Sequence, residues 1–363
     1  MMEAATTHAS PDQGIRRVQK LYGVQYLRAA AALGVVVFHA SERSGTHFAI
    51  GATGVDVFFV ISGFIMWVIV AGKPMSPWQF LRERLERIAP LYWIATAVMV
   101  AGALAGLFPN MRLTAGHVIG SLAFIPNRSP SNGEIWPVLV QGWTLTYEMF
   151  FYAVFAASLL LPVRSRLAVL TGLFALLVVL GFSASSDNPL LLTYTNPLIL
   201  EFLAGALIGK LWLEGKMPSP IVGVGLIVIA TAGFAFVGIT YVGFNAFVLG
   251  PLAAALLVGV LALERAGTVP RLRLPAYLGD ASYSIYLWHT LAISVVVKAA
   301  AAASIPGPTT LVIAVIVGVV AGIVAHEILE KPIAAILRNR RGLTVIVKPA
   351  VAIHPPAPGG AIP

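Results

Sequence analysis

The sequence predicts an all-α, polytopic integral membrane protein with about ten transmembrane helices and both termini in the cytoplasm. Of its 363 residues, 58% are hydrophobic and 11% are charged, whereas an ordinary soluble domain has roughly 25% charged residues. Apolar stretches of about 20 residues, the length that a helix needs to cross a bilayer, recur along the chain. Because lipid offers the backbone no hydrogen-bond partner, these stretches are expected to be helical. A water-soluble globular protein is therefore excluded.

We expect one membrane domain, residues 22–333, between two cytoplasmic tails. The N-terminal tail, 1–21, is polar and is expected to be disordered. The C-terminal tail, 334–363, ends in a run of proline, glycine and alanine and is expected to be flexible. Within the domain, the apolar stretches follow one another at 24–41, 50–71, 90–108, 138–161, 167–183, 197–213, 220–237, 243–263, 281–298 and 309–328.

The positive charges are expected to lie mostly on one side of the membrane. The formal net charge is +9, which in a soluble protein would raise the question of nucleic acid binding. When the spans alternate sides from a cytoplasmic N-terminus, all but four of the 24 lysine and arginine residues fall on the cytoplasmic side, as the positive-inside rule requires. The exceptions are Arg43, Arg112, Arg128 and Lys298. Contact with membrane lipids accounts for this charge, so no nucleic acid partner is expected.

A basic amphipathic helix is expected at the cytoplasmic surface over Met75–Ala89. It begins with Ser76 and Pro77, a typical helix start. Arg84 and Arg87 lie three positions apart on one face of this helix, and two guanidinium groups so placed can bind the oxygens of a phosphate. Attraction to anionic lipid headgroups is the alternative interpretation.

Arg28 and His39 lie in the first span, where an ionisable side chain is costly and is therefore a functional candidate. Eleven helical steps of about 100° separate them, so both side chains share one face and lie roughly 16 Å apart along the axis. Arg28 is then near the cytoplasmic surface and His39 near the outer end. Alternatively, Arg28 anchors the helix at the inner surface and His39 is an interfacial histidine.

Three carboxylates are expected at or above the middle of the membrane: Asp56 in the second span, Glu148 in the fourth and Glu201 in the sixth. They approach the depth of His39. A histidine near carboxylates in a cavity of low dielectric is the arrangement that supports a general base and stabilises its cation during proton transfer. Hydrogen bonding between helices that only fixes their packing is the alternative, and it weighs more for Asp56 and Glu201 than for Glu148.

The remaining candidates give weaker signals. His289 lies in the middle of the ninth span and could equally be a hydrogen-bonded core histidine.

The chain has no cysteine, which excludes disulfides, thiolate metal sites and a cysteine nucleophile. It also has neither a His-Glu-x-x-His motif nor a phosphate-binding glycine loop, so we expect no metal. Gly51, Gly54 and Gly63, around the second span, are expected to permit close helix contact.

An ordered set of short motifs resembles the acyltransferase 3 family of membrane acyltransferases and, within it, the ExoZ-like exopolysaccharide O-acetyltransferases. The set covers nearly the whole membrane domain, and its order makes it more specific than any one motif. The matching stretches are Val24-Gln25-Tyr26-Leu27-Arg28 running to Phe38-His39, Gly54 to Phe64, Arg84 to Arg87, Pro90-Leu91-Tyr92-Trp93, Trp143 to Glu148 with Phe151-Tyr152, Ser282 to His289, and Glu330-Lys331-Pro332.

The resemblance implies transfer of an acyl group, usually acetyl, from cytoplasmic acetyl-coenzyme A to a sugar hydroxyl on or beyond the outer face of the bacterial inner membrane. The acceptor would be a polysaccharide or a lipid-linked glycan. His39 would be the catalytic histidine, with Arg28 as its partner in an Arg-x10-His motif. Arg84 and Arg87 would form an Arg-x-x-Arg motif, and Glu148 would be the motif glutamate. Asp56, in the Gly54 to Phe64 stretch, joins these residues as a catalytic candidate.

From the spacing of Arg28 and His39 and from the resemblance, we hypothesise how the donor is bound. Arg84, Arg87 and Arg28 bind the phosphates of the donor at the inner surface, and its pantetheine arm, of about the same length as the separation of Arg28 from His39, reaches toward His39. There the imidazole either removes a proton from the sugar hydroxyl or is itself acylated first. A transporter or flippase for a glycan or small solute is the alternative function, since it would share the spans, the buried charges and the charge bias.

Overall fold

The computed structural model describes residues 20–73, 75–183, 186–243 and 245–339. Within these ranges the chain is helical and contains no β-strand. The predicted tails fall outside the described residues up to residue 19 and from residue 340 onward. A last helix, α14, covers Lys331–Asn339, so regular structure continues past the expected domain boundary at residue 333.

Helices of very different lengths make up the described chain. In order they are α1 (Tyr22–Ser44), the 3₁₀ turn η1 (Ala49–Thr53), α2 (Gly54–Gly72), α3 (Pro77–Leu104), α4 (Ala115–Leu122), α5 (Gly142–Ser158), α6 (Val163–Ser183), α7 (Pro189–Tyr194), α8 (Ile199–Leu213), α9 (Pro220–Thr240), α10 (Ala246–Arg265), α11 (Arg273–Asp280), α12 (Ser282–Ala302), α13 (Gly307–Ala325), the π turn η2 (His326–Glu330) and α14 (Lys331–Asn339).

Nine helical segments of the described chain are long and apolar enough to cross a membrane. They account for every predicted span except the one at 138–161. That span corresponds to α5, whose 17 residues rise about 25 Å at 1.5 Å per residue, less than the roughly 30 Å of a hydrocarbon core. The prediction of an all-helical, multi-pass membrane protein is confirmed, with α5 as a short helix inside the bundle.

The amphipathic segment predicted over Met75–Ala89 is the first half of the long helix α3 rather than a separate element. It starts as predicted: the Ser76 hydroxyl accepts a hydrogen bond from the Gln79 amide at 3.1 Å, and Pro77 occupies the first turn, where its missing N–H is not needed. The helix then continues through Pro90. A proline removes a single backbone bond, which neighbouring helices can compensate in a membrane bundle.

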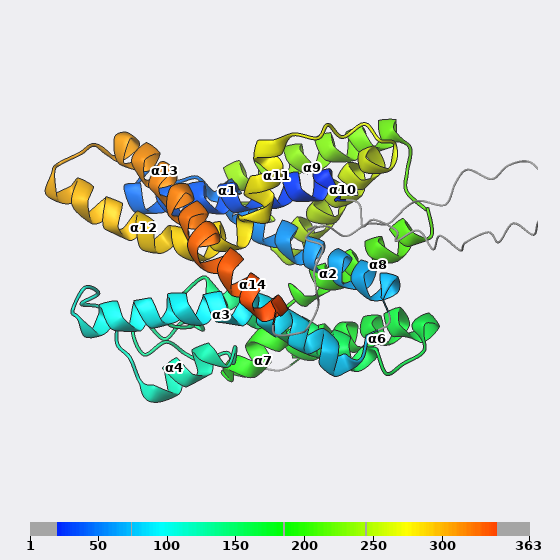
Figure 1. Cartoon of the computed structure of the whole chain (residues 1–363), viewed down its shortest axis with the longest axis horizontal. Helices are drawn as coiled ribbons and strands as arrows, with labels where there is room; N and C mark the ends of the chain where they lie inside the picture. The colour runs from blue at the N-terminus through cyan, green and yellow to red at the C-terminus, as the bar shows by residue number, and fades with distance from the viewer. Residues whose placement is uncertain (1–19, 74, 184–185, 244, 340–363) are drawn as a thin grey trace, which may run out of the picture.

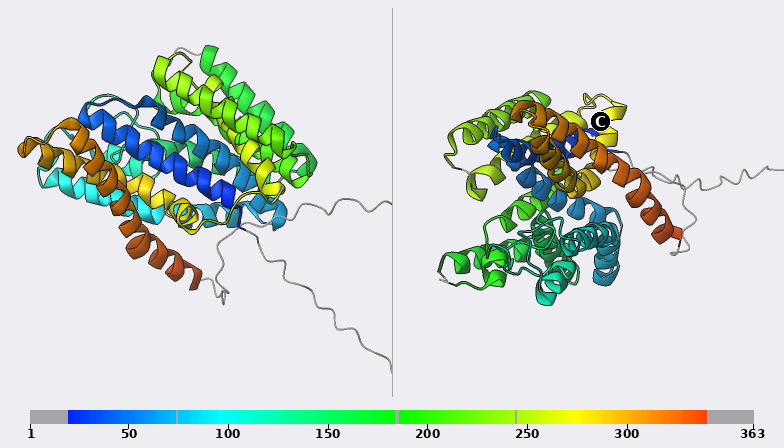
Figure 2. Two further views of the ribbon diagram at one scale, coloured as in Figure 1. Left: turned by 90° about the horizontal axis from the view of Figure 1, so that it is seen from above. Right: turned by 90° about the vertical axis from the view of Figure 1, so that its left-hand side faces the viewer.

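Helices α2 and α8 lie between two groups of helices (Figure 1). In that view α1 and α9 to α13 lie above them, and α3, α4, α6 and α7 lie below. Helix α14 diverges from the bundle after the π turn η2, as both views of Figure 2 show.

The contact between α2 and α8 depends on two glycines that face each other's backbone. A Cβ atom on Gly63 would lie 1.9 Å from the carbonyl oxygen of Phe202, and one on Gly205 would lie 1.9 Å from that of Val60. Real Cβ atoms do not approach an oxygen so closely. Small residues let the backbones of membrane helices meet in this way, and the prediction for Gly63 is confirmed.

Helix α1 packs against the start of the second span in the same manner. A Cβ atom on Gly51 would lie 2.1 Å from the carbonyl oxygen of Gly34, and one on Gly54 would lie 2.4 Å from that of Ala31. The predicted role of Gly51 and Gly54 in close helix contact is therefore confirmed.

The N-terminus of α1 is held by a carboxylate from a distant helix. Its N-cap residue, Leu21, offers no side-chain cap. Instead, the carboxylate of Glu264, at the end of α10, accepts hydrogen bonds from the amides of Tyr22 at 3.0 Å and Gly23 at 2.6 Å. These amides would otherwise lack partners, and the positive end of the helix dipole favours a carboxylate there. An ion pair of 2.5 Å between Lys20 and Asp280 fixes the same end against α11.

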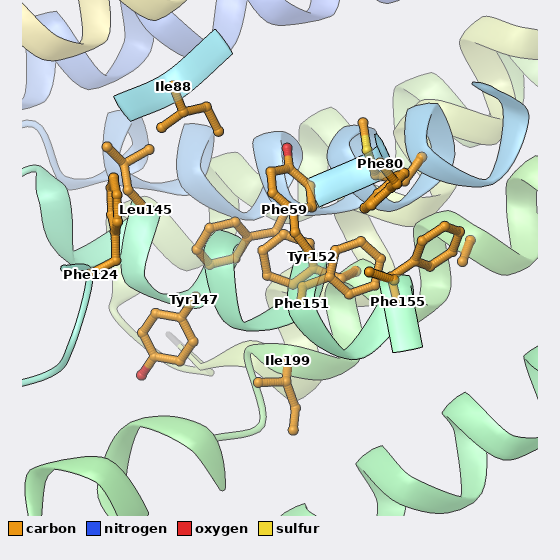
Figure 3. Packing of buried hydrophobic residues seen from close by; sticks show 14 of the residues in the cluster. Phe59, Phe80, Ile88, Phe124, Leu145, Tyr147, Phe151, Tyr152, Phe155 and Ile199 are labelled. Atoms are coloured by element: carbon orange, nitrogen blue, oxygen red, sulfur yellow. The ribbon is translucent and has the colours of Figure 1, made fainter. Parts of the chain in front are cut away.

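An aromatic cluster fills the space between α2, α3, α5 and α8 (Figure 3). Phe202 stacks on Phe59, with ring centroids 4.5 Å apart, and on Phe151, at 4.8 Å. The cluster supports the wall of the bundle on which Ser62 and Glu148 lie.

We predict that Gly63→Ala destabilises the protein, because the added methyl group has to push α2 away from the Phe202 backbone. Overpacking of this kind costs about 1–3 kcal/mol. Gly172→Ala, in α6, is the matched control because its Cβ would meet nothing within 4 Å. The thermal unfolding midpoint in detergent should fall by several degrees in the first variant and stay at the wild-type value in the second. Equal midpoints would show that the α2–α8 contact is not tight.

Candidate active site

His39 lines a cavity of about 570 Å³, here called the His39 cavity. The histidine comes from the last third of α1, and its ring lies 4.9 Å from that of Phe38 between centroids. The opposite walls carry aromatic rings and polar side chains from several helices. They include Asp56, Gln141, Trp143, Asn196, Asn245, Phe247 and Tyr286. The cavity offers His39 both space for a ligand and groups that can form hydrogen bonds.

Asp56 is the carboxylate that the structure brings to the His39 cavity. It is 5% exposed, and Glu201, from α8, is 2% exposed. Glu201 lies near enough to Asp56, where α2 packs against α8, for the two carboxyl groups to interact electrostatically. The described residues offer the Glu201 oxygens no hydrogen-bond partner.

Glu148 does not line the His39 cavity. It lines a smaller one of about 100 Å³, here called the Glu148 cavity. One of its carboxylate oxygens accepts hydrogen bonds from the Ser62 hydroxyl at 2.7 Å and from the Tyr152 hydroxyl. The three carboxylates, predicted to approach the depth of His39, thus lie in two places: Asp56 lines the His39 cavity with Glu201 beside it, and Glu148 lines another cavity.

Arg28 lines the Glu148 cavity from α1. Its guanidinium donates a hydrogen bond to Gln25 Oε1 at 3.2 Å. It also lies within electrostatic range of carboxylates from three other parts of the chain, Glu148, Asp280 and Glu330. Arg28 and His39, predicted to share one face of a helix, therefore each line a cavity, and the two cavities are different ones.

Arg84 and Arg87 occupy different environments although both belong to α3. Arg84 is 8% exposed and lies over the Phe80 ring at 6.0 Å. Its Nε and Nη1 atoms have no partner among the described residues. Arg87 is exposed and lines both the Glu148 cavity and a third cavity, the α3–α14 groove, of about 170 Å³. Of the two arginines, Arg87 is the one that faces open space.

The three cavities adjoin one another. Arg87 stands between the α3–α14 groove and the Glu148 cavity. Val55 and Tyr286 stand between the Glu148 cavity and the His39 cavity. The Tyr286 hydroxyl is held by Thr144 Oγ1 at 2.8 Å and by the carbonyl of Gln141 at 3.2 Å. These adjacent spaces form a row from the exposed Arg87 to His39, with Val55 and Tyr286 between the last two.

His289, which the sequence left undecided, lies beside His39. The ring centroids are 5.2 Å apart and the ring planes make an angle of 36°. His289 is fully buried in α12. Tyr286 lies three residues earlier on the same helix and was not singled out by the sequence analysis. A three-residue interval on a helix puts two side chains on one face, and this spacing was the available signal for both residues.

The π turn η2 carries a second polar cluster beside the Arg87 end of the row. The carboxylate of Glu330 accepts from the Ser284 hydroxyl at 2.5 Å and lies 2.7 Å from Nδ1 of His326. Glu330 also lines the α3–α14 groove.

Outside the spans, the Tyr277 hydroxyl donates to Glu327 at 2.6 Å, which raises the pKa of Tyr277 to about 12. In the described part of the chain, no three His, Asp or Glu side chains form a group that could hold a metal ion.

A family model described as an acyltransferase domain matches residues 21–327. The chain is 56% identical over 306 residues to the exopolysaccharide production protein ExoZ of Rhizobium meliloti (strain 1021), a match that covers 84% of this chain and 96% of ExoZ. It is 29% identical to BcsY, a candidate membrane-bound transacylase of Komagataeibacter xylinus, over 72% of this chain and 70% of BcsY.

A more distant relative is a candidate O-acetyltransferase of Staphylococcus aureus (strain COL). Identity is 22% over 316 residues, which is 77% of this chain and 52% of the relative. The chain therefore spans about half the length of that protein. No solved structure matches the chain.

We predict that Glu201→Leu destabilises the protein more than Glu201→Gln. A glutamine amide can donate a hydrogen bond to the buried Asp56 carboxyl, whereas a leucine cannot, and a typical intramolecular hydrogen bond contributes about 0.5–1.5 kcal/mol. Thermal unfolding in detergent, with both variants compared in one buffer, measures the difference. If the two variants unfold at the same temperature, the carboxyl pair contributes nothing to packing.

Proposed function

This chain belongs to the acyltransferase family, and we propose that it transfers an acetyl group from cytoplasmic acetyl-coenzyme A to a hydroxyl of an exported polysaccharide across the bacterial inner membrane. Members of the family are acyl-transferring enzymes, which favours catalysis over the transport that the sequence left open. The observation that carries the proposal is the row of adjoining cavities from Arg87 to His39.

The arginines at one end of the row fit the phosphates of the donor. Arg87 is exposed where the α3–α14 groove meets the Glu148 cavity, and Arg28 lies further along the wall of that cavity. The guanidinium of Arg84, buried one turn before Arg87, has nitrogen atoms with no partner in the described chain. A guanidinium can form paired, charge-assisted hydrogen bonds with phosphate oxygens. In this proposal Arg87 and Arg28 contact the phosphates, and Arg84 adds positive charge beneath them.

The Glu148 cavity then accommodates the pantetheine arm. The arm carries amide groups, which need hydrogen-bond partners once they leave water. Glu148, Ser62 and Tyr152 supply a carboxylate and two hydroxyls along this wall. Glu148 therefore acts on the donor side of the reaction, where it accepts a hydrogen bond from an amide of the arm. The thioester reaches Tyr286, at the boundary with the His39 cavity, and the donor as a whole stays on its own side of the membrane.

His39 performs the proton transfer. Its neutral imidazole accepts the proton of the sugar hydroxyl while the oxygen attacks the thioester carbonyl carbon. The carbon–sulfur bond then breaks, and the imidazolium returns the proton to the thiolate, so that the products are the acetyl ester and free coenzyme A. The other route, in which the imidazole is acylated first, would leave an acetyl-histidine that can be trapped with donor in the absence of acceptor.

The walls of the His39 cavity suit a carbohydrate acceptor. Trp143, Phe247 and Tyr286 offer aromatic faces for the apolar faces of sugar rings. Asn196, Asn245 and Asp56 offer amide and carboxyl groups for hydroxyls. The relative ExoZ is named for exopolysaccharide production, which supports a polysaccharide as the acceptor. In this proposal Asp56 orients the acceptor hydroxyl toward His39.

We predict that His39→Ala abolishes transfer, because general acid–base catalysis contributes about 10²–10⁴-fold in rate. The measurement is the incorporation of labelled acetyl from acetyl-coenzyme A into de-O-acetylated surface polysaccharide, in membrane vesicles that contain the variant. His47→Ala is the control, since His47 is an exposed histidine paired with Glu42 outside the His39 cavity. Activity of His39→Ala at the wild-type level would remove His39 from the site.

We predict that Arg87→Ala raises the KM for acetyl-coenzyme A about tenfold or more, because a hydrogen bond to a charged group is worth about 1.5–3 kcal/mol. Arg82→Ala is the matched control: Arg82 is an exposed arginine on the same helix, paired with Glu86 at 2.7 Å. Its removal should leave the KM unchanged. Equal effects of both substitutions would mean that α3 attracts the donor only through its general positive charge.

A further inference from the structure

His289 is a fully buried histidine with one ring nitrogen unsatisfied. Its Nδ1 atom lies 2.9 Å from the carbonyl oxygen of Ile285, one turn earlier in α12. Its Nε2 atom has no partner among the described residues. A buried polar atom without a partner is rare in folded proteins and calls for an explanation.

The partner of Nδ1 determines the tautomer of His289. A carbonyl oxygen can only accept, so Nδ1 carries the hydrogen, and the Nε2 atom of the neutral ring carries a lone pair. Nε2 therefore needs a donor. The nearest ring is that of His39, whose centroid lies 5.2 Å away.

Other polar groups near His289 already have partners. The guanidinium of Arg43 donates to the carbonyl of Thr290 at 3.0 Å and to Ser294. The Tyr286 hydroxyl, whose ring centroid lies 6.1 Å from that of His289, is bonded to Thr144 and Gln141. On the side of α13 the neighbour is Gly318, which has no side chain to offer. Asp56 faces His39 across the cavity. Among the rings around His289, that of His39 lies nearest and has an N–H to give.

We propose that His289 is a positioning residue whose Nε2 accepts a hydrogen bond from His39, directly or through one water, and fixes the tautomer of the His39 ring. This inference rests on the proposed function. Within the described structure no direct hydrogen bond joins the two rings, and hydrogen bonds of catalytic groups commonly tighten only when substrates are bound. With one nitrogen committed to His289, the other keeps its lone pair for the acceptor hydroxyl.

The same contact stabilises the imidazolium that His39 forms during the reaction. Arg43 lies four residues after His39, on the same face of α1, and its positive charge opposes a second cation there. A neutral acceptor at His289 Nε2 offsets part of that repulsion, because a hydrogen bond to a charged donor is stronger than one to a neutral donor. Histidine suits position 289 because its Nδ1–H is bound to the carbonyl oxygen of Ile285, which leaves Nε2 as a hydrogen-bond acceptor.

The test compares His289→Phe, which removes the acceptor, with His289→Gln, whose side-chain oxygen can replace Nε2. Transfer from acetyl-coenzyme A to de-O-acetylated surface polysaccharide is measured from pH 5 to 9 in detergent. We expect His289→Phe to lower kcat about 100-fold, to leave the KM for acetyl-coenzyme A within about twofold, and to change the acid limb of the pH profile. His289→Gln should keep kcat within about tenfold and the wild-type profile. His117→Gln, a substitution of a buried histidine in α4, is the control for general damage.

A second measurement does not depend on activity. In protein labelled with ¹⁵N at histidine, the His39 resonances, identified by their loss in His39→Ala, should report a single tautomer in the wild type and in His289→Gln, and a mixture in His289→Phe. A mixture in the wild type would overturn the proposal, as would wild-type kcat and pH profile in His289→Phe. A single His39 tautomer in a wild-type protein that transfers no acetyl group would instead overturn the proposed function and leave the pairing intact.

Discussion

The arrangement of the candidate site depends on how the N-terminus of α1 is held, because Arg28 and His39 both lie on that helix. The first amides of α1 carry the positive end of the helix dipole, and the carboxylate of Glu264 accepts hydrogen bonds from two of them. A shift of α1 by one residue would move both side chains by about 1.5 Å along the axis and turn them by about 100°. Glu264 and the Lys20–Asp280 ion pair therefore set the register of residues that line two separate cavities.

Most ionisable side chains within the bundle have a partner, as a medium of low dielectric requires. Glu148 is held by two hydroxyls, and Glu330 by Ser284 and His326. Arg84 and His289 are among those that differ, because each has at least one buried nitrogen atom without a partner in the described chain. One lies near the donor end of the row of cavities and the other beside His39. In the proposed reaction Arg84 adds positive charge beneath the donor phosphates, and the Nε2 atom of His289 accepts a hydrogen bond from His39.

The sequence alone predicted the parts of the site that follow from helix periodicity. The shared face of Arg28 and His39, the start of α3 at Ser76 and Pro77, and the close contacts of Gly51, Gly54 and Gly63 all depend on neighbours in the chain or on residue size. Periodicity does not say which helix packs on a given face. For that reason it could not show that Asp56 meets Glu201, that Arg84 is buried while Arg87 is exposed, or that His289 lies beside His39. Those facts depend on contacts between residues far apart in the sequence.

The close contact between α2 and α8 limits how these two helices can move. With Gly63 and Gly205 each against the other helix's backbone, neither helix can slide or tilt without breaking the contact. The two helices thus form one rigid unit that carries Val55, Asp56 and Glu201. A passage with one immovable wall has to widen at the other, and the wall that faces Val55 is α12 with Tyr286. Widening of the passage therefore requires movement of α12, the helix that also carries His289.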